Sequence, residues 1–190
     1  SRIFAIPNLK HPVGQYREVC RILEAESYDI VYLNISTAID CIAAWAAKKK
    51  KVPRIFIHSH TSGNDCENPV KRMIFDSIHK FCRLSLYRAA TEYYGCSEKA
   101  GLWMFPEKIV KSDRFQMIFN AVDLKKFTYS SAVRDDVRKE LNLENKFVVG
   151  HVGNFVYQKN HYFLIDIFEE LKRKCPEAVL LLLGRGERFE

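Results

Sequence analysis

Short apolar runs alternate with stretches of helical spacing along the first part of the chain. We expect strands at 28–34, 54–60, 91–97 and 115–122, and helices at 16–27, 37–50, 70–90 and 98–104. Strands that alternate with helices in this way are typical of an α/β protein with a parallel sheet.

The same alternation starts again after a charged stretch, 123–145, which is expected to hold a crossover and a helix. A strand at 147–152, a helix at 160–174 and a strand at 178–183 follow. One face of that helix is expected to hold its apolar side chains, Phe163, Leu164, Ile167, Phe168 and Leu171. We therefore predict an N-terminal domain at 1–122, a linker at 123–145 and the start of a second domain at 146–190.

Composition narrows the choice of partners only in part. Apolar residues make up 47% of the 190, which is enough for a substantial core, and the net charge is +7. A basic balance fits nucleic acid, anionic lipid or a phosphorylated ligand. Nucleic acid is disfavoured because no recognition motif accompanies the basic residues.

The cysteines and the chain ends indicate the compartment of the protein and its relation to a longer chain. Six scattered cysteines include no CxxC pair, which favours reduced thiols in a cytoplasmic protein and gives no zinc-site spacing. No signal peptide and no apolar run long enough to span a bilayer is recognisable. The chain begins SRIFAIP and stops at GRGERFE, so we expect a piece of a longer protein.

The stretch GHVGNFVYQKNH, residues 150–161, is the first candidate site. Its two glycines, Gly150 and Gly153, permit close approach to the backbone, and Lys159 precedes the helix expected from Asn160. The amino end of a helix favours an anion, so the stretch can form a diphosphate cradle. A tight turn with a solvated lysine explains the same pattern.

Three other places carry chemistry-bearing side chains. His58 and His60 end a strand and share one face, where imidazole can bind metal, act as a base or bond a sugar hydroxyl, or simply pack. Cys96 has no recognisable base partner, whereas Ser97 is expected to cap the next helix. Asp135 and Asp136 lie in a charged helix and are expected to be solvated.

The helix at 71–90 has a basic surface. Apolar and small residues are expected on one face, namely Ile74, Ile78, Phe81, Cys82 and Ser85, with basic residues around the rest. Such a helix can lie on anionic lipid, or it can be an ordinary surface helix.

Six stretches, taken in order, carry a family resemblance. They are YDIVYLN, RIFIHSH, YYGCSEKAG, MIFNAVDLKKF, VVGHVGNFVYQKNHYFLIDIF and AVLLLLGRGE, within residues 28–187. Together they resemble family 4 of the retaining glycosyltransferases, and most of all the bacterial enzymes that build capsular polysaccharides and exopolysaccharides.

The resemblance implies a fold and an activity. The fold is of GT-B type, here as parts of two Rossmann-like parallel-sheet domains, the first holding the acceptor and the second the nucleotide-sugar. The activity is transfer of a sugar from a nucleotide-sugar donor to a lipid-linked or growing polysaccharide acceptor, with retained configuration. No metal and no other cofactor is expected, and the implied location is the cytoplasm, peripherally at the inner face of the membrane.

The resemblance also implies roles for residues. His60 matches the histidine near the transferred sugar and acceptor, and Gly153 and Lys159 match the donor-phosphate loop. Asn154 stands where the family usually has arginine, so one cationic contact on the diphosphate is absent there. Ala121 stands where glycine is usual.

The family pattern is also incomplete at both ends of the chain. A first strand with its glycine-rich loop is expected before Ser1, and a glutamate motif that holds the donor is expected after Glu190. The 190-residue chain alone is therefore expected to bind donor poorly and to transfer nothing. Two alternatives stay open, a sugar-nucleotide epimerase of similar fold and a non-catalytic binding or scaffold relative.

Overall fold

The computed structural model describes residues 2–186 and divides the chain into two compact units, Ser1–Ala121 and Val122–Glu190. The sequence-derived motif GRGE therefore extends one residue, Glu187, beyond the described part. Each unit is an α/β structure with its own parallel sheet.

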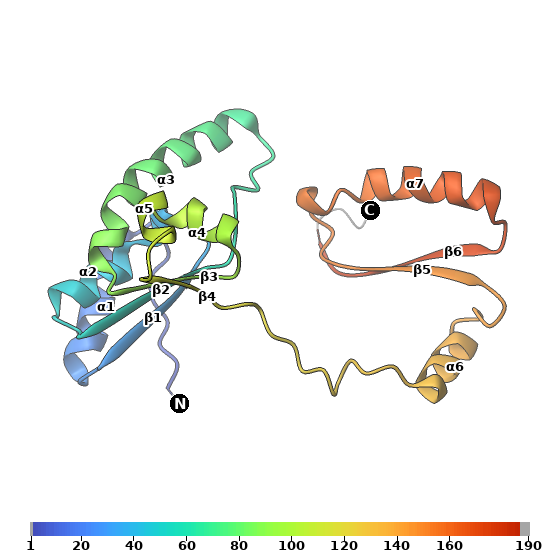
Figure 1. Ribbon diagram of the computed structural model, residues 1–190, viewed down its shortest axis with the longest axis horizontal. Coiled ribbons are helices and arrows are strands. Elements are labelled where there is room, and N and C mark those ends of the chain that lie inside the picture. The colour runs from blue at the N-terminus through green and yellow to red at the C-terminus, as the bar shows by residue number, and fades with distance from the viewer. Residues whose placement is uncertain (1, 187–190) are drawn as a thin grey trace. The chain divides into compact units, whose positions relative to one another are not determined.

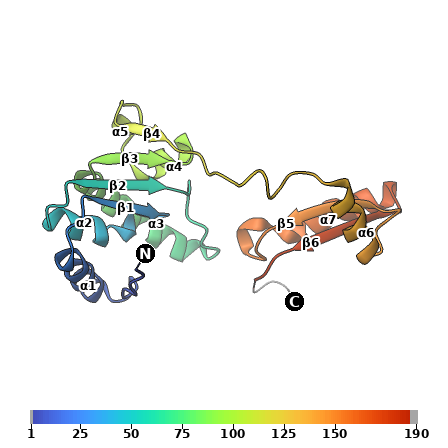
Figure 2. The same ribbon diagram turned by 90° about the horizontal axis from the view of Figure 1, so that it is seen from below.

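The first unit holds four parallel strands in the order β1-β2-β3-β4, as Figures 1 and 2 show. Its elements are α1 (Pro12–Ala25), β1 (Ile30–Ile35), the 3-10 helix η1 (Ala38–Asp40), α2 (Ile42–Lys49), β2 (Arg54–Ser59), α3 (Pro69–Ala89), β3 (Glu92–Gly95), α4 (Glu98–Met104), α5 (Glu107–Val110) and β4 (Phe115–Met117). Sequential strand order with right-handed crossovers puts the connecting helices on one face of the sheet, and Figure 1 shows α3, α4 and α5 there.

The core of the first unit lies between these helices and the sheet. Side chains alternate along a strand, so Ile55 and Ile57 of β2 and Tyr93 of β3 all face the helices, where they are buried. Leu86 of α3 and Met104 of α4 complete the core cluster from the helix side. The other face of the sheet carries aromatic side chains, Tyr32, Phe56 and Tyr94, in mutual ring contact.

Several element boundaries differ from the sequence prediction, and the helix expected at 37–50 is divided into η1 and α2. Helix α1 begins at Pro12 rather than Tyr16, because proline at the first helical position is preorganised for a helix. Strand β4 ends at Met117 rather than Val122, since the pairing with β3 stops after the bond from the Ile118 N–H to the Gly95 carbonyl.

The apolar face named from the sequence for the helix at 71–90 is not the face that is buried. In α3 the buried residues are His79, Leu86 and Ala89, whereas Ile78 and Phe81 are exposed, Phe81 by 77%. His79, a polar side chain, points inward on the same face as Leu86 and Ala89 and is hydrogen-bonded there. An apolar count alone does not assign such a residue to the buried face.

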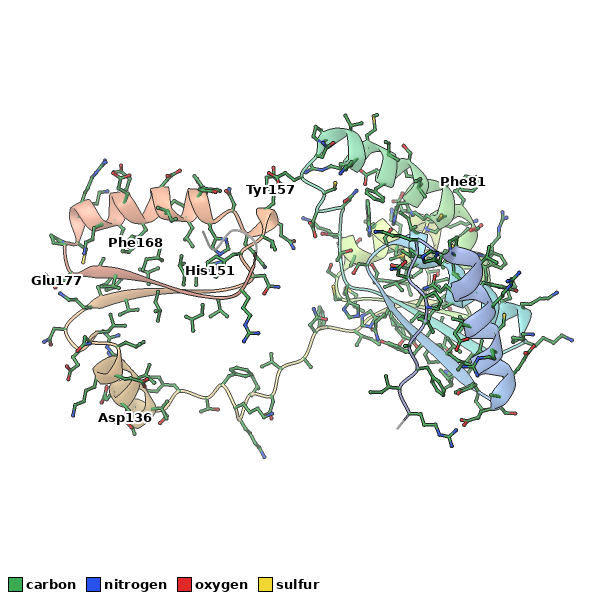
Figure 3. All side chains as sticks on the ribbon, turned by 180° about the vertical axis from the view of Figure 1, so that it is seen from behind. Phe81, Asp136, His151, Tyr157, Phe168 and Glu177 are labelled. Carbon is green, nitrogen blue, oxygen red and sulfur yellow. The ribbon has the colours of Figure 1, made fainter. Side chains whose placement is uncertain are left out.

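The second unit contains α6 (Ser131–Glu140), β5 (Phe147–Val152), the 3-10 helix η2 (Tyr157–Lys159), α7 (His161–Lys174) and β6 (Ala178–Leu183). The two strands pair in parallel, and both have the predicted bounds. Figure 3 shows Phe168 directed from α7 toward the strands. Phe163 and Ile167 are instead exposed by 60% and 51%, so the face predicted for this helix is correct only in part.

Candidate functional site

His60 lies directly after β2 and is held between two amide side chains. Its Nε2 lies 2.8 Å from Oδ1 of Asn34, at the end of β1, and its Nδ1 lies 3.2 Å from Oδ1 of Asn120, beyond β4. A neutral ring satisfies both contacts when one amide presents its nitrogen, because neutral imidazole has one donor and one acceptor. The two amides therefore fix the orientation of this ring at the carboxyl edge of the sheet.

His58 lies beside His60, with ring centroids 4.1 Å apart, but it is buried. Its Nδ1 lies 2.5 Å from the hydroxyl oxygen of Tyr32. Burial, followed by the neighbouring His60, lowers the pKa of His58, so its ring is held neutral. His58 is thus a packed histidine that supports the exposed edge of His60.

A cavity of about 560 Å³ opens in the first unit near the carboxyl ends of β1 and β2. Its lining includes Ser36, Thr37, Thr61, Asp76, His79 and Trp103. It places polar side chains of strand-end loops against an aromatic wall, at the edge of a parallel sheet where ligands bind.

His79 of α3 forms the buried wall of that cavity. Its Nδ1 accepts the N–H of Ala38 at 3.1 Å and also contacts the Thr37 hydroxyl, while its Nε2–H donates to the carbonyl of Trp103 at 2.9 Å. Its ring stacks on the indole of Trp103, with centroids 3.8 Å apart. Burial lowers the pKa of His79, so this ring too is neutral.

Cys96 and Ser97 end β3 as structural residues. The Ser97 hydroxyl accepts the N–H of Ala100, which confirms the predicted cap of α4. The N–H of Cys96 donates to the carbonyl of Ser59 and continues the pairing with β2.

In the second unit, Lys159 and the glycines meet at the carboxyl end of β5. A Cβ atom added at Gly153 would lie 3.1 Å from the ring of His151 and 3.6 Å from Cε of Lys159. The tight contact at Gly153 is with the His151 ring, and the aliphatic stem of Lys159 passes Gly153 at an ordinary van der Waals distance. Gly150 lies within β5, with open space where a Cβ would stand.

Most backbone N–H groups of this loop are already bonded within the chain. The N–H groups of Gly153 and Phe155 donate to the carbonyls of Leu183 and Arg185, at 2.9 and 2.8 Å, and the N–H of Lys159 donates to Val156. An anion here would meet the exposed Lys159 ammonium and the first turn of α7, whose first N–H groups have no intrahelical partner. Asn154 is exposed beside it.

A buried histidine, His161, and a partly buried one, His151, pack beside this loop. The ring of His161, the first residue of α7, stacks on Phe155 with centroids 4.6 Å apart and meets His151 edge-on at 4.9 Å. Neither ring nitrogen of His161 has a hydrogen-bond partner in the part of the chain that the structure describes. Sequence reasoning missed this packing, as it missed Asn34, Asn120 and the inward turn of His79.

Across residues 2–186, no three His, Cys, Asp or Glu side chains group closely enough to hold a metal ion. Asp135 pairs with Arg134 at 2.7 Å on α6, where Asp136 also lies (Figure 3). None of the helices in this described range is both long and apolar enough to cross a membrane.

One curated relative matches nearly the whole chain. EpsF of Bacillus subtilis (strain 168), whose name describes it provisionally as a glycosyltransferase, is 25% identical over 194 residues. The match covers 98% of this chain and 48% of EpsF, so the chain spans about half the length of that relative. No protein-family model matches the chain.

Solved structures share the fold. The Anabaena protein HepE (Alr3699), in complex with UDP-glucose, matches 97% of this chain with a TM-score of 0.69 and 18% identity, over 47% of its own length. The UDP-GlcNAc 2-epimerase of Neisseria meningitidis, bound to UDP-GlcNAc, matches 95% of this chain and 49% of its own with a TM-score of 0.57 and 14% identity. The expected fold class, GT-B type with parts of two Rossmann-like parallel-sheet domains, is confirmed.

Proposed function

We propose that the chain is part of a retaining glycosyltransferase that transfers a sugar from a nucleotide-sugar donor to a lipid-linked or growing polysaccharide acceptor. The observation that carries the proposal is the Lys159 loop of the second unit, an exposed cation whose stem crosses a glycine at a strand end. The relationship to EpsF and the fold shared with HepE, which was solved with UDP-glucose, support it.

The proposed mechanism divides the work between the units. Lys159 and the first turn of α7 stabilise the nucleoside diphosphate, on which negative charge develops as the glycosidic bond breaks. His60, oriented by Asn34 and Asn120, lies against the transferred sugar and acceptor. Gly153 and Asn154 line the donor side. The reaction as proposed uses no metal and no other cofactor.

The test is transfer by the whole protein that contains this chain. It is incubated with a panel of nucleotide-sugars and a lipid-linked acceptor extract, and released nucleotide and incorporated sugar are measured. We expect acceptor-dependent release that collapses in Lys159→Ala and survives in Lys174→Ala, a control lysine at the far end of α7. Release without incorporation, with an epimerised sugar, would favour the epimerase alternative. No release from any donor by the folded protein would favour the scaffold alternative.

The proposed acceptor and location include an anionic membrane surface, which would be met by α3. Its exposed side carries six large apolar side chains, Val70, Met73, Ile74, Ile78, Phe81 and Leu84, all at least 43% exposed. Exposed cations lie beside this stripe, at Lys71, Lys80 and Arg88. Apolar insertion flanked by cations suits a helix that lies in an anionic interface, so the apolar side, rather than the basic one, faces the lipid.

Co-sedimentation with vesicles tests this surface. The protein should bind phosphatidylglycerol vesicles more strongly than phosphatidylcholine vesicles, and Phe81→Ser should weaken binding severalfold. Phe127→Ser, which removes an equally exposed ring outside α3, should not. Equal loss in the two variants would contradict a specific role for α3.

A further inference from the structure

The loops that follow β5 and β6 continue to pair beyond the strand ends. The last pair of the ladder is Val152 with Leu183. The bonds from the N–H of Gly153 to the Leu183 carbonyl and from the N–H of Phe155 to the Arg185 carbonyl extend the same parallel pattern. This register places Arg185 directly beside Asn154.

Two glycines hold Arg185 in that place. A Cβ atom at Gly184 would lie 1.9 Å from the carbonyl oxygen of Gly153, and one at Gly186 would lie 2.4 Å from the carbonyl oxygen of Phe155. Gly186 also has a φ of +156°, which favours glycine. Close approach of the two loops therefore depends on glycine on both sides of Arg185, whose side chain is the one that residues 184–186 present.

The charges around Arg185 are unbalanced. Arg185 and Lys159 are both exposed, and neither has an ion-pair partner among the described residues. Residues 150–161 and 183–186 contain no acidic side chain. Buried beside them, His161 keeps both ring nitrogens unpartnered within the described range. Within residues 2–186, two adjacent strand ends thus present two cations without an acidic partner, an arrangement that favours an anion.

We propose that Arg185 is the second cation on the diphosphate of the nucleotide-sugar, acting from the neighbouring strand beside the uncharged Asn154. The backbone bonds place Arg185 beside Asn154, and the Lys159 stem lies against the preceding residue, Gly153. The two cations hold the diphosphate from the two adjacent strand ends, and guanidinium binds phosphate oxygens in a bidentate manner. The inference rests on the proposed function.

Binding of UDP to the whole protein that contains this chain, measured by titration calorimetry, tests the proposal. Arg185→Ala should weaken UDP binding by roughly tenfold or more, and Arg185→Lys by less, because a bidentate charged contact is lost. Adding Asn154→Arg to Arg185→Ala should restore most of the affinity, since the charge returns to the adjacent strand. The matched control Arg173→Ala, on α7 and paired with Glu169 and Glu170, should bind as the wild type does.

The possible outcomes separate this inference from the proposed function. If Lys159→Ala weakens UDP binding and Arg185→Ala does not, the role of Arg185 is overturned and the proposed function stays intact. Inorganic pyrophosphate is a second probe, and its binding should be weakened by Arg185→Ala in the same way as the binding of UDP. Pyrophosphate binding through Arg185 without UDP binding would refute the nucleotide-sugar function and keep the anion site. Binding of neither probe by the folded wild type would overturn both.

Discussion

Gly184→Ala should disrupt the second unit out of proportion to the single carbon atom added. The new Cβ would stand 1.9 Å from the Gly153 carbonyl oxygen, where contacts below 3.0 Å are essentially never seen. The two loops must therefore move apart by about 1 Å, since backbone cannot rotate away as a side chain can. That movement breaks the bonds from the N–H groups of Gly153 and Phe155.

The expected cost follows from those two bonds. At about 1 kcal/mol each, their loss destabilises the loop pair by about 2 kcal/mol or more. Amide hydrogen exchange at Gly153 and Phe155 should then accelerate roughly 30-fold. Gly150→Ala is the matched control, because its Cβ meets nothing within 4 Å, and it should leave stability unchanged or raise it by up to about 1 kcal/mol. Equal exchange rates in the two variants would refute the argument that glycine is needed for loop contact.

Further predictions concern the first unit. His79→Phe leaves a buried amide and a buried carbonyl without their partner and should cost about 2–4 kcal/mol in urea unfolding. Burial lowers the pKa of His79, so the unfolded chain takes up a proton at this residue before the folded chain does. The contribution of neutral His79 to the stability of the fold is therefore complete above about pH 6.5 and is lost as the pH falls from there to the lowered pKa. This loss of stability in acid should be smaller in His79→Phe. Gly101→Ala places a Cβ 2.5 Å from the Phe115 ring and should lower stability by about 1–3 kcal/mol, whereas Gly63→Ala meets nothing; equal melting temperatures would contradict this packing. Ser97→Ala should lower the free energy of unfolding by about 1 kcal/mol, because it removes the cap of α4. Ser97→Asp should keep the wild-type stability, because aspartate also caps a helix.

The strands of the second unit could be predicted from the sequence because residues of distinct type mark both ends of each strand. The apolar runs 147–152 and 178–183 stop at glycine on one side and at charged residues or proline on the other, and β5 and β6 have those bounds. The face of α3 could not be read in this way. A buried histidine, bonded to η1 and α4, shares the buried face with Leu86 and Ala89, while several large apolar side chains lie on the exposed face.

The glycine pattern of the candidate site was informative but incomplete. Two glycines three residues apart indicated a close approach at 150–153. A Cβ at Gly153 would meet the His151 ring most closely and the Lys159 stem next, whereas a Cβ at Gly150 would meet nothing within 4 Å. The second partner is the loop at 184–186, about thirty residues away in the chain, which no local pattern identifies. Likewise, the amides that hold His60 come from positions 34 and 120, and only the parallel order of the strands brings them together.

The most direct test of the account is a ¹H–¹⁵N spectrum of the whole protein that contains this chain, titrated with UDP-glucose. The donor site as proposed predicts that the amide signals of Gly153, Lys159, His161 and Arg185 shift together with one saturation curve, and that Lys159→Ala abolishes those shifts. Signals of α1 in the first unit should stay in place. Shifts confined to the first unit, or no shift near Lys159 at saturating ligand, would contradict a donor site at the carboxyl ends of β5 and β6.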